Sequence, residues 1–433
     1  MERTKRDESQ ERGDFLPCRD EDDTEHGPFS SGLVEDVIPH VCKFLGPKDI
    51  RHCRLVCKSW NYGATSVLKN KTIIIIPLYP KKCRLIDSDE TKDKLTFAHT
   101  SVCLVIGGHQ PIDPKIFDEI TNLKSIVVRS STKKPLEKDL FPKIILNSAS
   151  TLKHLKFGGG ESLEFPSFRG VVFPKLANLD LHHFWDEGSQ DIERIGHAIT
   201  EAFPALQHLR IAYRYMPGLS WMKFLPKFPT SLNSLELHEL LNINYMNCLL
   251  EFPHPLKTLK FTSTSFQDRV DDLPWLFYKF LKKHSPTLEK LCLQISTNRM
   301  DNLKLNWIFP AFPVMQNLTI CNSDMFASLK FEISLGNFGQ INYKICFPVL
   351  RVLRICRTHS IPNVAHDLSC MAGFLPLQGD NGCPESVKEV DLYILDETLT
   401  SDRNLVKADL NDQLLKIFPN AKGSIKDVWE LVV

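Results

Sequence analysis

The chain has 433 residues, with 53 lysines and arginines against 52 aspartates and glutamates. This length exceeds that of a usual single compact domain and predicts either several domains or an array of repeats. A net charge of +1 argues against binding to nucleic acid or an anionic membrane through overall positive charge. The 13 cysteines include no C-x-x-C pair, which is typical of reduced thiols in a cytoplasmic or nuclear protein.

Residues 1–29 are rich in charged side chains and poor in apolar ones. Such a segment cannot bury enough apolar surface to offset the entropy lost on ordering, so we predict a disordered N-terminal tail. It lacks the apolar stretch of a signal peptide. The longest aliphatic run of the chain, Ile73 to Ile76, is too short to span a bilayer. We therefore expect no membrane partner.

Residues 32–62 predict two short amphipathic helices separated by Gly46-Pro47. Glycine permits the cap that ends one helix, and proline suits the first turn of the next. Both helices carry apolar side chains three or four residues apart, which is the spacing of one helix face. They are Leu33, Val37, Val41, Phe44 and Leu45, followed by Ile50, Cys53, Val56, Cys57 and Trp60. Two helices this short cannot enclose a core, so we expect an exposed apolar face that binds a partner.

The stretch GLVEDVIPHVCKFLGPKDIRHCRLVCKSWN resembles the F-box family, and we assign residues 30–70 to an F-box helical domain. Its elements come in the family's order, namely Leu33, Glu35, Val37-Ile38, Phe44-Leu45, Asp49-Ile50 and Leu55-Val56-Cys57-Lys58-Ser59-Trp60. The sequence departs from the family at Val34, where the family pattern has a proline that is pre-organised for the first helical turn.

The resemblance implies docking on a Skp-family adaptor, which joins a cullin scaffold in an SCF-type ubiquitin ligase. The residues expected to contact the adaptor are Leu33, Val34, Val37, Val41, Phe44, Leu45, Ile50, Val56 and Trp60. We expect Phe44 and Trp60 to contribute most, because buried aromatic side chains often dominate interfaces. The departure at Val34 keeps an alternative open, a binding scaffold with a drifted F-box and no link to ubiquitin.

Residues 71–122 form a linking segment with degenerate first repeats. Residues 71–76 predict a first strand, and residues 95–97 and 102–106 predict the strands of two early repeats. The polar stretch 81–94 between them is expected to be a loop.

From residue 123 onward the pattern F-P-x-L-x-x-L-x-L recurs, and it is clearest from Phe173 to Leu181. The first apolar positions of ten units are 123, 152, 176, 206, 232, 256, 288, 315, 350 and 387. Their spacing, from 24 residues (152 to 176) to 37 (350 to 387), is typical of a repeat array. The alternative is a mixed globule with chance leucine spacing.

The last two apolar residues of each unit lie two apart, so on a strand they face the same side. Stacked copies would build a parallel sheet with one apolar and one polar face, and the proline would end each return segment. Residues 192–199 and 276–281 have helical spacing and predict helical returns.

The units over 123–395 resemble the leucine-rich repeat family, without its regular asparagine or cysteine after the last leucine. The predicted fold class is therefore α/β. A small helical F-box domain precedes an irregular leucine-rich-repeat solenoid, a parallel-sheet horseshoe over residues 123–433 that ends in a C-terminal cap.

The polar face of this sheet is the expected target-binding surface. One residue of each unit lies between the paired strand apolars, in order Val127, Lys156, Asp180, Arg210, Glu236, Lys260, Cys292, Thr319, Arg354 and Asp391. From Lys156 to Lys260 the charge alternates, so neighbouring strands can pair laterally. The row is either a self-neutralising ladder or a strip that recognises a mixed-charge protein surface. His182, His238, Gln294 and Tyr393 would widen that strip.

The sequence contains no motif typical of an enzyme active site, such as G-x-S-x-G, H-E-x-x-H or a phosphate-binding loop. Gly158 to Gly160 predicts a tight turn, and His182-His183 a polar rim. The set His366, Cys370 and Cys383 fits no zinc-site spacing. We expect no metal, no cofactor and no catalytic residue. The predicted function is that of a substrate receptor of a cullin-type ubiquitin ligase, whose repeats bind a target protein.

Overall fold

The computed structural model describes residues 31–71, 74–78, 101–106, 121–130, 140–158, 166–168, 170–182, 195–212, 226–238, 243–263, 272–295, 307–321, 329–331, 342–357, 385–394 and 403–427. The chain divides into two compact units at Lys71 and Thr72. The predicted tail 1–29, the loop 81–94, the strand 95–97, and His183, His366, Cys370 and Cys383 lie outside the described residues.

The described residues of the first unit, 31–71, form three helices, where the sequence analysis predicted two. They are α1 (Ser31–Cys42), α2 (Pro47–Cys53) and α3 (Lys58–Lys71). Gly46 lies at the N-cap of α2 with Pro47 in its first turn, as expected. The first helix ends at Cys42, so Phe44 and Leu45 belong to the turn that follows it.

The expectation that this unit cannot enclose a core is wrong, because α3 packs on the first two helices and completes a small core. The buried residues of this core come from all three helices and are Ile38, Cys42, Ile50, Ala64, Val67 and Leu68. Gly63 allows α3 to pack closely on α1, since a β-carbon there would lie 2.8 Å from Cγ2 of Ile38. The core uses Ile38 and Cys42 of α1, so the Val37 and Val41 face of that helix is left exposed.

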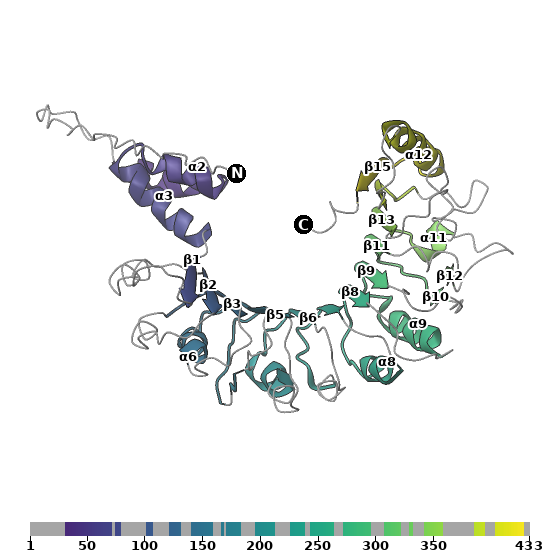
Figure 1. Ribbon diagram of the computed structural model, residues 1–433, viewed down its shortest axis with the longest axis horizontal. Coiled ribbons are helices and arrows are strands. Elements are labelled where there is room, and N and C mark those ends of the chain that lie inside the picture. The colour runs from purple at the N-terminus through teal and green to yellow at the C-terminus, as the bar shows by residue number, and fades with distance from the viewer. Residues whose placement is uncertain are drawn as a thin grey trace, which may run out of the picture. The chain divides into compact units, whose positions relative to one another are not determined.

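The second unit is organised by a 13-stranded sheet whose strands follow one another in chain order (Figure 1). The strands are β1 (Ile74–Leu78), β2 (Ser101–Ile106), β3 (Ser125–Ser130), β4 (His154–Gly158), β5 (Asn178–His182), β6 (His208–Ala212), β7 (Ser234–His238), β8 (Thr258–Ser263), β9 (Lys290–Ile295), β11 (Asn317–Cys321), β13 (Val352–Arg357), β14 (Glu389–Ile394) and β15 (Lys422–Asp427). Neighbouring strands pair in parallel.

The ten predicted repeat units are confirmed as strands β3 to β9, β11, β13 and β14, and the first apolar residue of each is buried. Equivalent residues pair across the sheet, so that Leu155, Leu179, Leu209, Leu235 and Leu259 form a continuous row. The first strand, predicted over 71–76, is confirmed in part: β1 begins at Ile74, Lys71 is the last residue of α3, and the strand continues through Pro77. Proline is tolerated there because β1 is an edge strand.

The return segments place helices on the outer side of the sheet (Figure 1). They include α6 (Leu140–Asn147), α8 (Ile243–Leu250), α9 (Leu273–His284), α11 (Tyr343–Cys346) and α12 (Arg403–Ile417). The helix expected at 276–281 is confirmed within α9. Residues 195–197 are α-helical and Ala198–Ala202 form a wider π-helix, while 192–194 lie outside the described residues. The strands β10 (Trp307–Phe309) and β12 (Leu329–Phe331) pair as a separate small sheet.

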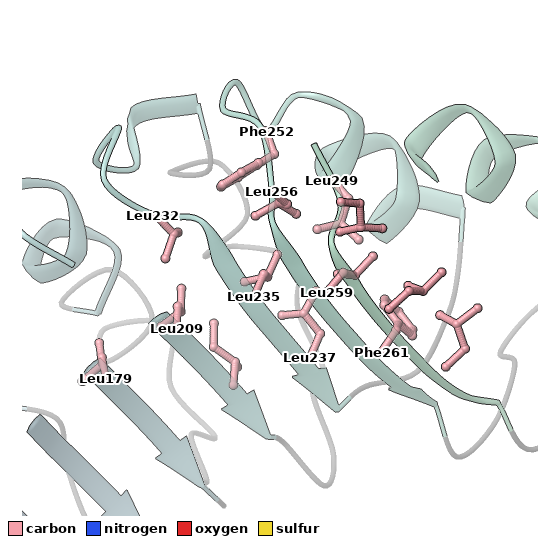
Figure 2. Packing of buried hydrophobic residues seen from close by; sticks show 14 of the residues in the cluster. Leu179, Leu209, Leu232, Leu235, Leu237, Leu249, Phe252, Leu256, Leu259 and Phe261 are labelled. Carbon is pink, nitrogen blue, oxygen red and sulfur yellow. The ribbon is translucent and has the colours of Figure 1, made fainter. Parts of the chain in front are cut away.

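The core of the second unit lies between the sheet and these returns. Figure 2 shows the strand residues Leu235, Leu237, Leu259 and Phe261 with Leu249 of α8. The phenylalanines of the Phe-Pro pairs add an aromatic layer. Phe173 and Phe203, both fully buried, meet edge to face with ring centroids 5.4 Å apart. Such contacts stabilise a core beyond the area they bury.

Hydroxyl side chains connect successive repeats of the second unit. Thr151, Ser231 and Thr287 each directly precede the first leucine of a unit. Each donates a hydrogen bond to the carbonyl of the first leucine of the preceding unit, at 2.9 Å to Leu123, 2.8 Å to Leu206 and 2.9 Å to Leu256. These bonds satisfy buried backbone carbonyls that would otherwise cost stability.

Candidate docking surfaces

The helical unit exposes large apolar side chains that its own core does not use. Phe44 is 90% exposed, Leu55 82% and Tyr62 80%. Val37, Val41 and Val56 are exposed as well. Val37 and Val41 lie one turn apart on the same face of α1. So many exposed apolar side chains on so small a unit are typical of a protein that binds a partner.

The predicted adaptor contacts other than Ile50 divide into three groups. Val37, Val41, Phe44 and Val56 are exposed and available to a partner, whereas Leu45 and Trp60 are half-buried against the core of the unit. Leu33 and Val34 belong to α1, but their side chains lie outside the described part.

The structure corrects the prediction that Ile50 contacts the adaptor. Ile50 is fully buried in the core of the helical unit and so cannot contact a partner. Leu55 and Tyr62 are exposed residues that the prediction omitted. Leu55 could have been found because it precedes Val56 in the F-box pattern, whereas Tyr62 stands after that pattern ends.

The second candidate surface is the polar face of the sheet, where the predicted charge ladder is present. Lys156, Asp180, Arg210, Glu236 and Lys260 occupy one row across β4 to β8. Each neighbouring pair forms an ion pair, at 2.8 Å for Lys156–Asp180, 3.8 Å for Asp180–Arg210, 3.2 Å for Arg210–Glu236 and 2.7 Å for Glu236–Lys260. The ladder therefore neutralises most of its own charge.

Two histidines complete the ladder from the next row of the same face. His182 Nε2 lies 3.3 Å from Asp180 Oδ1, and His238 Nε2 lies 2.7 Å from Glu236 Oε1. Burial raises the pKa of the Glu236 carboxyl, but hydrogen bonds from His238 and Lys260 and the charges of Lys260 and Arg210 outweigh it. The pKa falls from 4.5 to about 2. Glu236 is therefore ionised at neutral pH.

Replacing Glu236 with glutamine is expected to lower the thermal stability of the chain at neutral pH. Because its pKa is depressed in the folded state, the stabilisation is present above 4.5 and is lost as the pH falls toward about 2. The difference in melting temperature between wild type and Glu236→Gln should therefore shrink over that range. Glu385→Gln, which removes an exposed carboxyl, serves as control. A difference that does not depend on pH would contradict this role for Glu236.

Beyond β8 the same row loses its charge, with Cys292 on β9 and Thr319 on β11. A hydrogen bond with Cys321 and burial raise the pKa of the Cys292 thiol, so it is protonated at neutral pH. Cys321 Sγ lies 3.0 Å from Cys356 Sγ, and both are free thiols. Gln294, a predicted contact, is exposed on β9.

Tyr393 is a further correction, because it is only 6% exposed and packs with Cys321 and Cys356 rather than facing a partner. Arg354, another predicted contact, is held by two carboxylates, at 2.8 Å from Glu389 and 3.2 Å from Asp391. Ser424 on β15 also bonds to Asp391. This second charged cluster lies at the C-terminal end of the sheet.

The family model described as F-box domain matches residues 30–72, which contain α1 to α3. The chain therefore carries an F-box domain, followed by an all-parallel sheet of the kind found in leucine-rich repeats. Comparison with curated proteins gives no match. Within the described ranges, no helix is long and apolar enough to cross a membrane, and no group of three or more His, Cys, Asp or Glu could hold a metal ion.

Proposed function

We propose that the chain is the substrate-recognition subunit of an SCF-type ubiquitin ligase. The F-box docks on a Skp-family adaptor joined to a cullin scaffold, and the repeat unit binds the target protein. The observation that carries the proposal is the F-box match on a helical unit that exposes Phe44, Leu55 and Tyr62. An apolar surface of this kind is stabilised by burial against a partner.

The second unit suits the binding of a protein target. Its polar face spans many strands, and a recognition interface of standard size buries about 1,600 Å² in total. Binding there holds the target beside the ubiquitin-conjugating enzyme. The encounter between a target lysine and the charged enzyme then becomes nearly intramolecular, which raises its effective concentration. In this proposal the chain positions the target protein, and the partner enzymes catalyse the transfer of ubiquitin.

Retention of purified adaptor and cullin on the immobilised full chain tests the proposal. We expect the adaptor to be retained by itself, and the cullin to be retained only when the adaptor is present. The substitution at Val34 supports a second candidate function, an interaction scaffold with a drifted F-box. Failure to retain either protein would favour that candidate and contradict the ligase proposal.

A further inference from the structure

The cations of the charge ladder stand further out than its carboxylates. The side chains of Lys156, Arg210 and Lys260 are 36%, 31% and 39% exposed, against 21% for Asp180 and 22% for Glu236. A partner that approaches this face therefore meets positive charge first, although the row is nearly balanced in sum.

Each carboxylate of the ladder lies close to three basic side chains, whereas each cation faces only one or two carboxylates. Glu236 Oε1 is shared by Arg210, Lys260 and His238. Asp180 is likewise surrounded by Lys156, Arg210 and His182. An ammonium group has three donors and a guanidinium five. The cations therefore have more donors than carboxylate partners and can donate to an anionic group.

Across β4 to β8 the row on the other side of the ladder adds no positive charge. It contains His154, Asn178, His208, Ser234 and Thr258. Burial lowers the pKa of both His154 and His208 below the ordinary value of 6.5, and for His154 it is the largest of several causes. Both rings are therefore neutral at pH 7. Across β4 to β8 the outward positive charge of these two rows is thus that of the three ladder cations, and the flanking row continues on β9 with the exposed Lys290.

These cations lie on alternate strands, β4, β6 and β8. Two strand spacings amount to about 9.6 Å, close to one turn of a polyproline II helix, which has three residues at about 3.1 Å each. A segment in this conformation that crosses the strands would therefore place every third side chain on the same side, near a cation.

We propose that the ladder binds an acidic segment of the target protein, in polyproline II conformation, with Asp or Glu at about every third position. This inference rests on the proposed function in that it assigns the sheet face to the target. The carboxylates of the segment bind Lys156, Arg210 and Lys260, while the neutral side chains of the flanking row can bond to its backbone. The class of target is thus a protein with an exposed acidic stretch.

Fluorescence anisotropy on the full chain tests the inference. The probe is a labelled serine-rich peptide with Glu at every third position, compared with one carrying Lys at the same positions. We expect the Glu peptide to bind at least about tenfold tighter, and its affinity to fall as salt is added. The double variant Lys156→Gln/Lys260→Gln should weaken binding by about tenfold. Lys344→Gln on α11, away from the sheet face, should leave it unchanged.

A second variant separates recognition from folding. Asp180→Asn removes one carboxylate and leaves the cations in place, so it should tighten binding of the Glu peptide, which a damaged fold cannot do. Equal binding of the Glu and Lys peptides, or no loss in the double variant, would overturn the inference. So would equal binding of a peptide with the same number of consecutive Glu, or tenfold tighter binding of a phosphoserine counterpart. Adaptor retention by the same preparations reports separately on the proposed function.

Discussion

Replacing Phe44 with alanine is expected to weaken binding to the Skp-family adaptor by about a hundredfold, without unfolding the helical unit. The side chain is 90% exposed in the free chain and makes no part of the core of that unit. A buried aromatic anchor at an interface contributes about 2–4 kcal/mol, and each 1.4 kcal/mol is a factor of ten. Calorimetric titration of each full-length variant with the purified adaptor measures the change.

Two further variants show that the loss is specific. Trp275→Ala also removes a partly exposed aromatic side chain, but from α9 of the second unit, and it should leave adaptor binding unchanged. Ile50→Ala should instead lower the stability of the helical unit, because its side chain is fully buried. Wild-type affinity in Phe44→Ala would show that the exposed face is not the docking site.

Replacing Phe203 with alanine is expected to destabilise the repeat unit by about 3–5 kcal/mol, the usual cost of removing a fully buried phenylalanine. Phe203 is 0% exposed and packs on Phe173 and on Phe168, with ring centroids 5.4 Å and 5.7 Å apart. Because each repeat contacts only its neighbours, the cavity should loosen the strands β5 and β6 first. Urea unfolding gives the total loss, and amide hydrogen exchange places it along the chain.

The matched control for Phe203 is Val172→Ala, in the segment that leads to Phe173. Val172 is exposed, so its truncation should change the free energy of unfolding by no more than about 0.5 kcal/mol. A loss below about 1 kcal/mol in Phe203→Ala would contradict the role given to the aromatic layer.

The second compact unit was predictable because the same short pattern of apolar residues, two apart along a strand, recurs in each repeat. Two apolar residues separated by one polar residue fix which face of a strand is buried, and the recurrence fixes which residues meet across the sheet. The row Leu155, Leu179 and Leu209 and the ladder from Lys156 to Lys260 both follow from that register. The hydroxyl bonds of Thr151, Ser231 and Thr287 were missed, although a serine or threonine before the first leucine can be read from the sequence.

The helical unit was less predictable because more than one face of α1 is apolar. Val37 and Val41 form one stripe, and Ile38 and Cys42 form the next. Periodicity alone does not say which stripe is buried; the packing of α3 decides it. No local sequence pattern indicates that the two helices approach closely at Gly63, which is what permits this packing.

The site residues on the sheet show a similar limit. Tyr393 occupies a polar-face position in the register, but the small side chains of Cys321 and Cys356 on the neighbouring strands leave room for its ring to pack down. The burial of such a residue depends on the size of the side chains on the next two strands of the sheet. A pattern read along a single strand does not contain that information.

The measurement that tests the central claim most directly is the affinity of the full chain for a purified Skp-family adaptor in solution. Docking through the exposed apolar side chains of α1 to α3 predicts saturable one-to-one binding with a Kd of about 1 μM or tighter. Absence of a complex at about 100 μM adaptor, with the helical unit folded, would contradict it.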